Sequence, residues 1–269
     1  MIDLKRNSKK KPVKALGLRK KVNSIYKPNQ KEDFRISRGK FANFLSCKRC
    51  FYLDRVKGLD APGTPAWTLN ETTDLLLKKE FDYCRENQIK HRLFKGKNLD
   101  NLVPFKHPEI DDWRNSLHKG VSRRFKNTNI ILTGGIDDIW QNVSTKEIII
   151  VDYKSQSKSE LIDANSYLND PYHEGYKIQM DFYAYLLSGK GFLLSPISYF
   201  LVCNAKRDEN KFDKKMYFDE YLIPYEWKTN WIDKEVRNMI DLLNQDQIPE
   251  SNYACKNCAY SNQYLNLLR

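Results

Sequence analysis

The segment IIIVDYKS at residues 148–155 places two opposite charges, Asp152 and Lys154, in an otherwise apolar stretch. Its four consecutive β-branched residues predict a β-strand. Side chains alternate along a strand, so Asp152 and Lys154 face one side of it while Tyr153 faces the other. Burying charged groups costs free energy unless they have partners or a purpose. This charged pair is therefore the strongest functional signal in the sequence.

A second strand is predicted just upstream. Residues 129–141, NIILTGGIDDIWQ, are rich in β-branched and apolar residues, and a short polar turn separates them from residues 148–155. Two such strands form a hairpin, which can bring Asp137 next to Asp152. A hard divalent cation such as Mg²⁺ relieves the repulsion between two adjacent carboxylates. Lys154 would then offer positive charge to an attacking water or to the transition state.

The remaining segments of the chain alternate between the periodicity of a helix and that of a strand. Apolar residues recur at helical spacing in some segments, and β-branched residues dominate others. This order predicts an α/β fold with a mixed central sheet flanked by helices. One continuous helix is expected to begin after the capping residue Ser37 and to end at about Val56. Further helices are expected at about 69–87, 175–189 and 227–246, and further strands at 196–205 and 215–225.

Positive charge is concentrated at the N-terminus. Of the 269 residues, 1–33 hold eleven Lys or Arg against three acids, within a formal net charge of +12 for the chain. Few apolar residues recur there, so we expect a disordered basic tail at 1–33, followed by one folded domain at 34–269. The tail either contacts phosphate groups or only increases solubility.

No stretch of about eighteen apolar residues is found, so no membrane-spanning helix and no membrane partner are expected. The basic N-terminus lacks the apolar segment of a secretory signal. We therefore expect a cytoplasmic, reducing location, where the six cysteines are thiols or metal ligands rather than disulfides.

Four of the cysteines form two C-x-x-C pairs, Cys47 with Cys50 and Cys255 with Cys258. Two such pairs are typical of a tetrahedral Zn²⁺ site or an iron–sulfur cluster. The intervening distance of about two hundred residues is unusual for a zinc finger, which closes a short loop. Cys84 and Cys203 have no paired partner and are expected in the core.

The combination of GGIDDIW, IIIVDYKS and YKIQMDFYAY resembles the core of RecB-family nucleases in the PD-(D/E)XK superfamily. The resemblance implies a restriction-endonuclease-like core, with Asp137 and Asp152 as ligands of Mg²⁺ or Mn²⁺ and Lys154 as the catalytic cation. It also implies catalytic contributions from Gln179 and Tyr183, which match the family's Q-x-x-x-Y motif. Residues four apart share one face of a helix, so both can lean over the site.

Many of these nucleases take a further metal ligand, usually His, from an early helix. The corresponding stretch, TLNETTDLLLKKEFD, contains no His, and Asp74 is nearest the expected place. Carboxylate oxygen suits Mg²⁺ and Mn²⁺, so the replacement is chemically reasonable. Glu71 and Glu80 are the less favoured substitutes.

The cysteine segments SCKRCFYLDR and CKNCAY are similar to those of AddB-type and CRISPR-associated RecB-like nucleases. In those proteins one N-terminal cysteine and three C-terminal cysteines hold a four-iron four-sulfur cluster. Here the division is two plus two. The resemblance favours the cluster, and Zn²⁺ remains the alternative.

The resemblance implies a Mg²⁺- or Mn²⁺-dependent deoxyribonuclease that acts on ends or single strands, with nucleic acid, and in particular DNA, as its partner. A helicase or another repair or recombination protein is a further expected partner. The alternative function is a catalytically weak nucleic-acid-binding module that keeps the nuclease fold.

Overall fold

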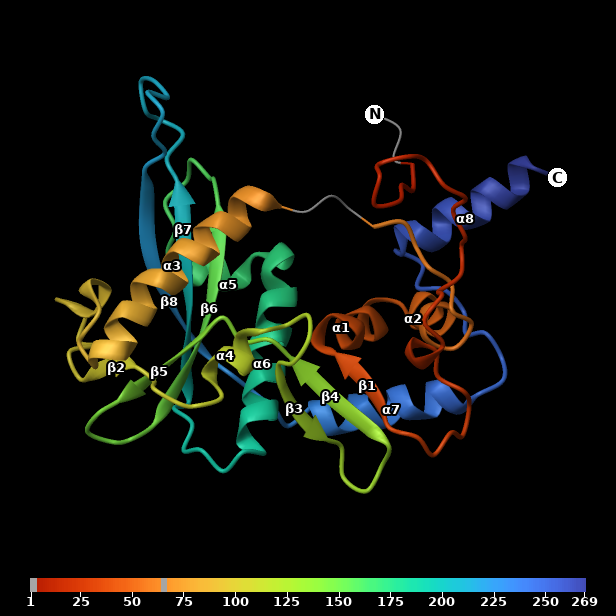
Figure 1. Ribbon diagram of the computed structural model, residues 1–269, viewed down its shortest axis with the longest axis horizontal. Helices are drawn as coiled ribbons and strands as arrows, with labels where there is room; N and C mark the ends of the chain where they lie inside the picture. The colour runs from red at the N-terminus through yellow and green to blue at the C-terminus, as the bar shows by residue number, and fades with distance from the viewer. Residues whose placement is uncertain (1–3, 64–66) are drawn as a thin grey trace. The chain divides into compact units, whose positions relative to one another are not determined.

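A computed structural model describes residues 4–63 and 67–269 (Figure 1). The described residues divide into two compact units. Unit 1 lies within residues 1–65, 125–131 and 234–269, and unit 2 lies within residues 66–124 and 132–233. The carboxylates of the predicted active site all belong to unit 2, whereas the four paired cysteines all belong to unit 1.

Unit 2 is built on a five-stranded sheet in the order β2-β5-β6-β7-β8. β6 and β7 are parallel, and the other neighbouring strands are antiparallel. The sheet is therefore mixed, as predicted. The strands are β2 (Leu102–Pro104), β5 (Asp138–Asn142), β6 (Ile148–Gln156), β7 (Ile197–Ala205) and β8 (Phe218–Glu226).

Helices cover both faces of this sheet. The long helix α3 (Thr68–Asn87) packs Leu77 and Phe81 against the face that carries Val151 and Tyr153. In Figure 1 it crosses the strands of unit 2. On the opposite face lies α6 (Glu174–Ser188), whose polar side chains reach Asp152. The other helical segments of the unit are α4 (Ile110–Arg114), α5 (Ala164–Asn169), η2 (Arg92–Phe94) and η3 (Pro171–His173).

Unit 1 has the predicted cap but not the predicted continuous helix. The Ser37 hydroxyl accepts a hydrogen bond from the backbone of Lys40 at the start of the first helix. The chain then becomes extended at Cys47, with φ −156° and ψ 107°, which breaks the helix in two. Its elements are β1 (Phe34–Ser37), α1 (Arg38–Ser46), α2 (Lys48–Arg55), α7 (Ile232–Asn244), α8 (Lys256–Leu267) and the short η1 (Val22–Ser24).

The predicted strand at 129–141 is also divided. Its first part is β4 (Ile130–Gly134), which like β3 (Val121–Arg124) lies outside the five-stranded sheet, and its second part is β5. The chain passes from one to the other through Gly135, where a Cβ atom would lie 2.4 Å from that of Ser116. Only glycine fits this close approach.

The predicted boundary at residue 33 stays a prediction. Upstream of it, the Tyr26 side chain is buried, and its hydroxyl donates to Asn244 Oδ1 at 3.1 Å. Within the described ranges, no helix combines the length and apolar character needed to cross a membrane.

Candidate active site and cysteine centre

The strand β6, which carries Asp152 and Lys154, extends beyond its neighbour β5. The antiparallel pairing of the two strands ends at Asp138 opposite Val151, whereas β6 continues to Gln156 with β7 alone as its partner. From Asp152 onward, one edge of β6 is therefore free of β5. The predicted site residues gather around this open edge.

Asp137 occupies the position where the ladder between β5 and β6 stops. Its Oδ2 atom accepts a hydrogen bond from the backbone N–H of Tyr153 at 2.9 Å. Burial and repulsion from Asp152 raise the pKa of Asp137 to about 7, while Lys154 and Lys78 oppose the rise. A carboxylate that repels its neighbour in this way favours the arrival of a cation.

Asp152 is fully buried and is held from two sides. Its Oδ2 atom accepts a hydrogen bond from Lys154 Nζ, which confirms that these two side chains share a face. Its Oδ1 atom accepts from Gln179 Nε2 at 2.6 Å, and the same nitrogen lies 3.0 Å from the Tyr183 hydroxyl. The structure thus brings together Asp152, Lys154, Gln179 and Tyr183, while their catalytic roles stay predictions.

Tyr176 joins this group without having been predicted from the sequence. Lys154 Nζ lies 4.6 Å from the centre of its ring, a separation that permits a cation–π interaction. Tyr176 lies three residues before Gln179 on α6, so both occupy one face of the helix. That spacing is the sequence signal that could have identified it.

Asp74 approaches the open edge from α3. Its carboxylate pairs with Lys78 Nζ at 2.8 Å. Burial raises the pKa of Asp74, Asp137 raises it further, and Lys78 and Lys154 act against the rise. Because Asp137 and Lys154 both influence Asp74, the predicted third ligand lies in the electrostatic field of the site.

The three carboxylates of Asp74, Asp137 and Asp152 are nevertheless not tightly clustered. Among the described residues, only the four cysteines bring three or more potential ligand atoms within 4.8 Å of one another. Oxygen donors of this kind suit a hard divalent cation such as Mg²⁺ or Mn²⁺. The assignment of these three residues as metal ligands stays a prediction.

Asp138 forms a second buried network beside the site. It is completely buried, and its carboxylate accepts hydrogen bonds from Arg85 Nη2 and, at 2.7 Å, from the Tyr153 hydroxyl. Sequence reasoning did not identify this network. Alternation along a strand places Asp138 on the opposite face from Asp137, which is the signal that distinguishes the two aspartates.

A pocket of about 570 Å³ in unit 2 opens next to this edge. Tyr176, which contacts Lys154, forms part of its wall, as do Ser155 and Thr73, the sequence neighbours of Lys154 and Asp74. Aromatic and polar side chains share the lining. The other lining residues are Trp67, Leu69, Asn70, Gln156, Ser157, Ala205, Met216 and Phe218.

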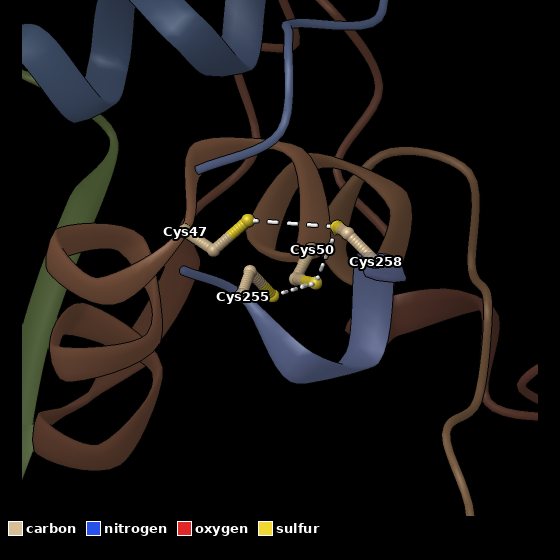
Figure 2. Close-up of side chains that lie close together, drawn as sticks. All are labelled: Cys47, Cys50, Cys255 and Cys258. Carbon is tan, nitrogen blue, oxygen red and sulfur yellow. Dashed lines mark hydrogen bonds between the residues drawn. The ribbon is translucent and has the colours of Figure 1, made fainter. Parts of the chain in front are cut away.

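The four paired cysteines converge in unit 1, as Figure 2 shows. Cys47 Sγ lies 3.8 Å from Cys258 Sγ, and Cys50 Sγ lies 3.5 Å from Cys255 Sγ and 3.4 Å from Cys258 Sγ. The predicted convergence of two segments that are 205 to 211 residues apart is thus confirmed. The identity of any bound metal stays a prediction at this point.

The thiols of this centre have unequal acidities. Burial disfavours ionisation of Cys47, but hydrogen bonds from the backbone of Cys50 and Asn252 lower its pKa to about 7. Burial raises the pKa of Cys258 to about 11. Thiolates are the species that bind metal, so the lowered pKa of Cys47 favours its binding of metal at neutral pH.

The two other cysteines lie outside this centre, as predicted. Cys203 belongs to the hydrophobic cluster around Phe81 and Tyr153, and burial raises its pKa to about 12. Cys84 is buried in α3.

Comparisons with known proteins give a family for the chain. The family model of the PD-(D/E)XK nuclease superfamily matches residues 66–263, more than half of the chain. A crystal structure of a candidate exonuclease from Eubacterium rectale is similar with a TM-score of 0.41 and 11% identity, over 84% of this chain and 87% of that one. Comparison with curated proteins gives no match.

The family match accounts for the architecture of unit 2. A mixed sheet between helices, with Asp152 and Lys154 on the central strand β6, is the restriction-endonuclease-like α/β fold that the sequence predicts. Nucleases of this superfamily usually use divalent metal ions. The chain belongs to the PD-(D/E)XK nuclease superfamily.

Proposed function

We propose that this nuclease hydrolyses phosphodiester bonds of DNA with Mg²⁺ or Mn²⁺ held by Asp137, Asp152 and Asp74. The network around Asp152 carries the proposal. Lys154 and Gln179 hold the two oxygens of this buried carboxylate, so its orientation is fixed before any substrate arrives. Groups that are fixed in advance need little reorganisation during the reaction, which lowers the barrier.

Each of the surrounding side chains has a specific task in this proposal. A bound divalent cation would polarise the phosphodiester and lower the pKa of the attacking water. Lys154, positioned between Asp152 and the Tyr176 ring, would neutralise charge that develops on the phosphate. Gln179 would hold Asp152, and Tyr183 would orient the Gln179 amide.

The pocket supports a substrate with unpaired bases. Trp67 and Phe218 lie in its lining and remain 74% and 37% exposed, so their rings are available to stack on bases. Stacking on aromatic side chains contributes about 1–3 kcal/mol per base and tolerates any sequence. We therefore propose single strands or frayed ends of DNA as the substrate.

The subfamily, the partners and the cellular location in this proposal follow from the resemblance to RecB-family nucleases. The order of motifs supports a RecB-like nuclease related to the AddB-type and CRISPR-associated enzymes. A helicase or another repair or recombination protein would supply the unpaired strand. The lysine-rich residues 1–33 would add phosphate contacts, and a reducing cytoplasm would keep the cysteines available for metal.

The deciding experiment compares cleavage of single-stranded and double-stranded DNA of one sequence, with Mg²⁺ or Mn²⁺ and with EDTA. We expect metal-dependent cleavage by the wild type and its loss in Asp152→Ala. The matched control is Asp111→Ala, because the Asp111 side chain is 84% exposed and pairs only with Arg114 among the ion pairs of the described residues. Binding of DNA without cleavage in either metal would instead identify the catalytically weak binding module.

Two further experiments test whether the substrate is DNA and whether the pocket binds it. An RNA strand of the same sequence should be cleaved much more slowly than DNA, and faster cleavage of RNA would contradict the DNA assignment. Trp67→Ala and Phe218→Ala should raise KM for the single strand, whereas Tyr172→Ala, at an exposed position outside the pocket lining, should not. Equal KM values for all three variants would exclude the pocket as the strand-binding site.

A further inference from the structure

We infer that Cys47, Cys50, Cys255 and Cys258 bind one zinc ion, not a four-iron four-sulfur cluster. The inference goes beyond the nuclease function and does not depend on it. Its basis is the separation of the sulfur atoms, which all lie within 4.8 Å of one another. Three of these separations are 3.4, 3.5 and 3.8 Å.

These separations match a single tetrahedral ion. Four thiolates at about 2.3 Å from one Zn²⁺ lie about 3.8 Å from one another. In a four-iron four-sulfur cluster, each thiolate binds a different iron atom. Four iron and four sulfide atoms would then have to fit among the thiolates, and sulfur atoms within 4.8 Å of one another leave no space for them.

The two halves of the centre are built alike. Cys47 is the N-cap of α2 and Cys255 is the N-cap of α8, and the second cysteine of each pair follows three residues later. The positive ends of both helices therefore stabilise the negative charge of the thiolates. Two C-x-x-C pairs that supply all four ligands form a closed structural zinc site, with no position left for a substrate.

The few contacts of α8 indicate that the ion has a structural role. Cys258 is the only buried residue in this helix, and Tyr260, Tyr264 and Leu267 are all more than half exposed. Just before the helix, Asn252 Nδ2 donates to the backbone oxygen of Ser46 at 2.9 Å. With so little apolar contact, the helix needs the metal to stay attached to α2, a role in which zinc supplies folding free energy.

The first test is the metal content of the full chain, purified without oxygen from cells supplied with both iron and zinc. Dialysis against EDTA first removes ions from weaker carboxylate sites. We expect colourless protein with about one zinc per chain and no acid-labile sulfide. Brown protein with about four iron and four sulfide atoms per chain would overturn the inference, as would protein without either metal.

Variants locate the ion. Cys50→Ser should lose the zinc, whereas Cys84→Ser, at a buried cysteine outside the centre, and Asp152→Ala should keep it. Zinc lost from Asp152→Ala instead would place the ion in the active site. If Cys50→Ser does not fold, wild-type protein refolded with Co²⁺ gives the answer, because four thiolates produce intense sulfur-to-cobalt charge-transfer absorption. Absence of that absorption in folded, cobalt-loaded protein contradicts the assignment.

Limited proteolysis tests the structural role. Removing zinc with a thiol-reactive mercurial should expose the Lys256 peptide bond to trypsin, and zinc-loaded protein should resist cleavage there. Cleavage at equal rates in the two forms would show that the ion does not hold α8. The readout requires no nuclease activity, so a failure of the DNA-cleavage proposal would leave this result unchanged.

Discussion

Asp137 and Asp138, adjacent in the chain, accept hydrogen bonds from opposite ends of Tyr153. Asp137 Oδ2 accepts from the backbone N–H of Tyr153 at 2.9 Å, and Asp138 Oδ2 accepts from its hydroxyl at 2.7 Å. One aspartate therefore lies at the open edge of β6, where a metal can approach. The other lies in the core, where it pairs with Arg85.

We predict unequal losses of stability from replacing these two neighbours. Asp138→Ala leaves the Arg85 guanidinium, only 5% exposed, without its buried partner and with only the longer ion pair to Asp82 at 3.8 Å. Breaking one side of a buried ion pair costs about 3–5 kcal/mol. Urea denaturation should show this loss for Asp138→Ala and a much smaller one for Asp137→Ala. A similar loss in both variants would contradict the division of roles.

Asp137 should also make the stability of the metal-free protein depend on pH. Its folded pKa, about 7, lies above the value of about 3.9 in an unfolded chain. The folded state thus binds the proton more tightly, so this contribution to stability is complete below about pH 4 and is lost as pH rises through 7. Thermal melts of Asp137→Asn should lack this decline.

We predict that the same titration governs metal binding at the proposed site. Mg²⁺ binds the ionised carboxylate, so it should raise Tm more at about pH 8 than at about pH 5. In Asp137→Asn the rise in Tm on addition of Mg²⁺ should be small at both pH values. An equal increment in wild type and variant would show that the cation binds elsewhere.

Gln179 is predicted to act by positioning Asp152. Gln179→Ala removes the donor at 2.6 Å and should reduce kcat by roughly ten- to hundredfold, in line with the loss of other groups that orient metal ligands. Gln179→Glu adds a negative charge there and should be at least as harmful. The control is Gln141→Ala on β5, which should cleave normally. Unchanged kcat in Gln179→Ala would exclude the positioning role.

Asp74 stands where the resemblance to RecB-like nucleases predicts a His ligand. Asp74→Ala should reduce metal-dependent cleavage by about a hundredfold or more, by comparison with the smaller effects of residues that only orient ligands. Asp74→His should retain some activity and favour Mn²⁺. Glu86→Ala, at an exposed position on the same helix, is the control. Full activity of Asp74→Ala would make Glu71 the next residue to test.

The sequence predicts individual elements well where one periodicity continues without interruption. The helix expected at about 69–87 begins at Thr68 and ends at Asn87, and the strand expected at 148–155 ends one residue later. The alternation of Asp152, Tyr153 and Lys154 across the two faces of β6 is likewise visible in the sequence, because strand geometry determines it.

The sequence does not reveal where tertiary contacts override local pattern. The break at Cys47 interrupts a helical stretch where the thiol faces the C-terminal cysteines, and the glycine required at Gly135 lies close to Ser116, nineteen residues earlier. The pairing of Asp138 with Arg85 depends in the same way on how α3 packs. Such contacts join distant segments and leave no local signature.

Gly134 affects the position of Asp152 indirectly, through Tyr183 and Gln179. A Cβ atom there would lie 2.7 Å from the Tyr183 ring, so the ring rests against bare backbone. Tyr183 contacts Gln179, and Gln179 contacts Asp152, which makes a relay of three side chains. A single added methyl group at Gly134 would push on the first member of this relay, so the alignment of the Asp152 carboxylate depends on the absence of a side chain at Gly134.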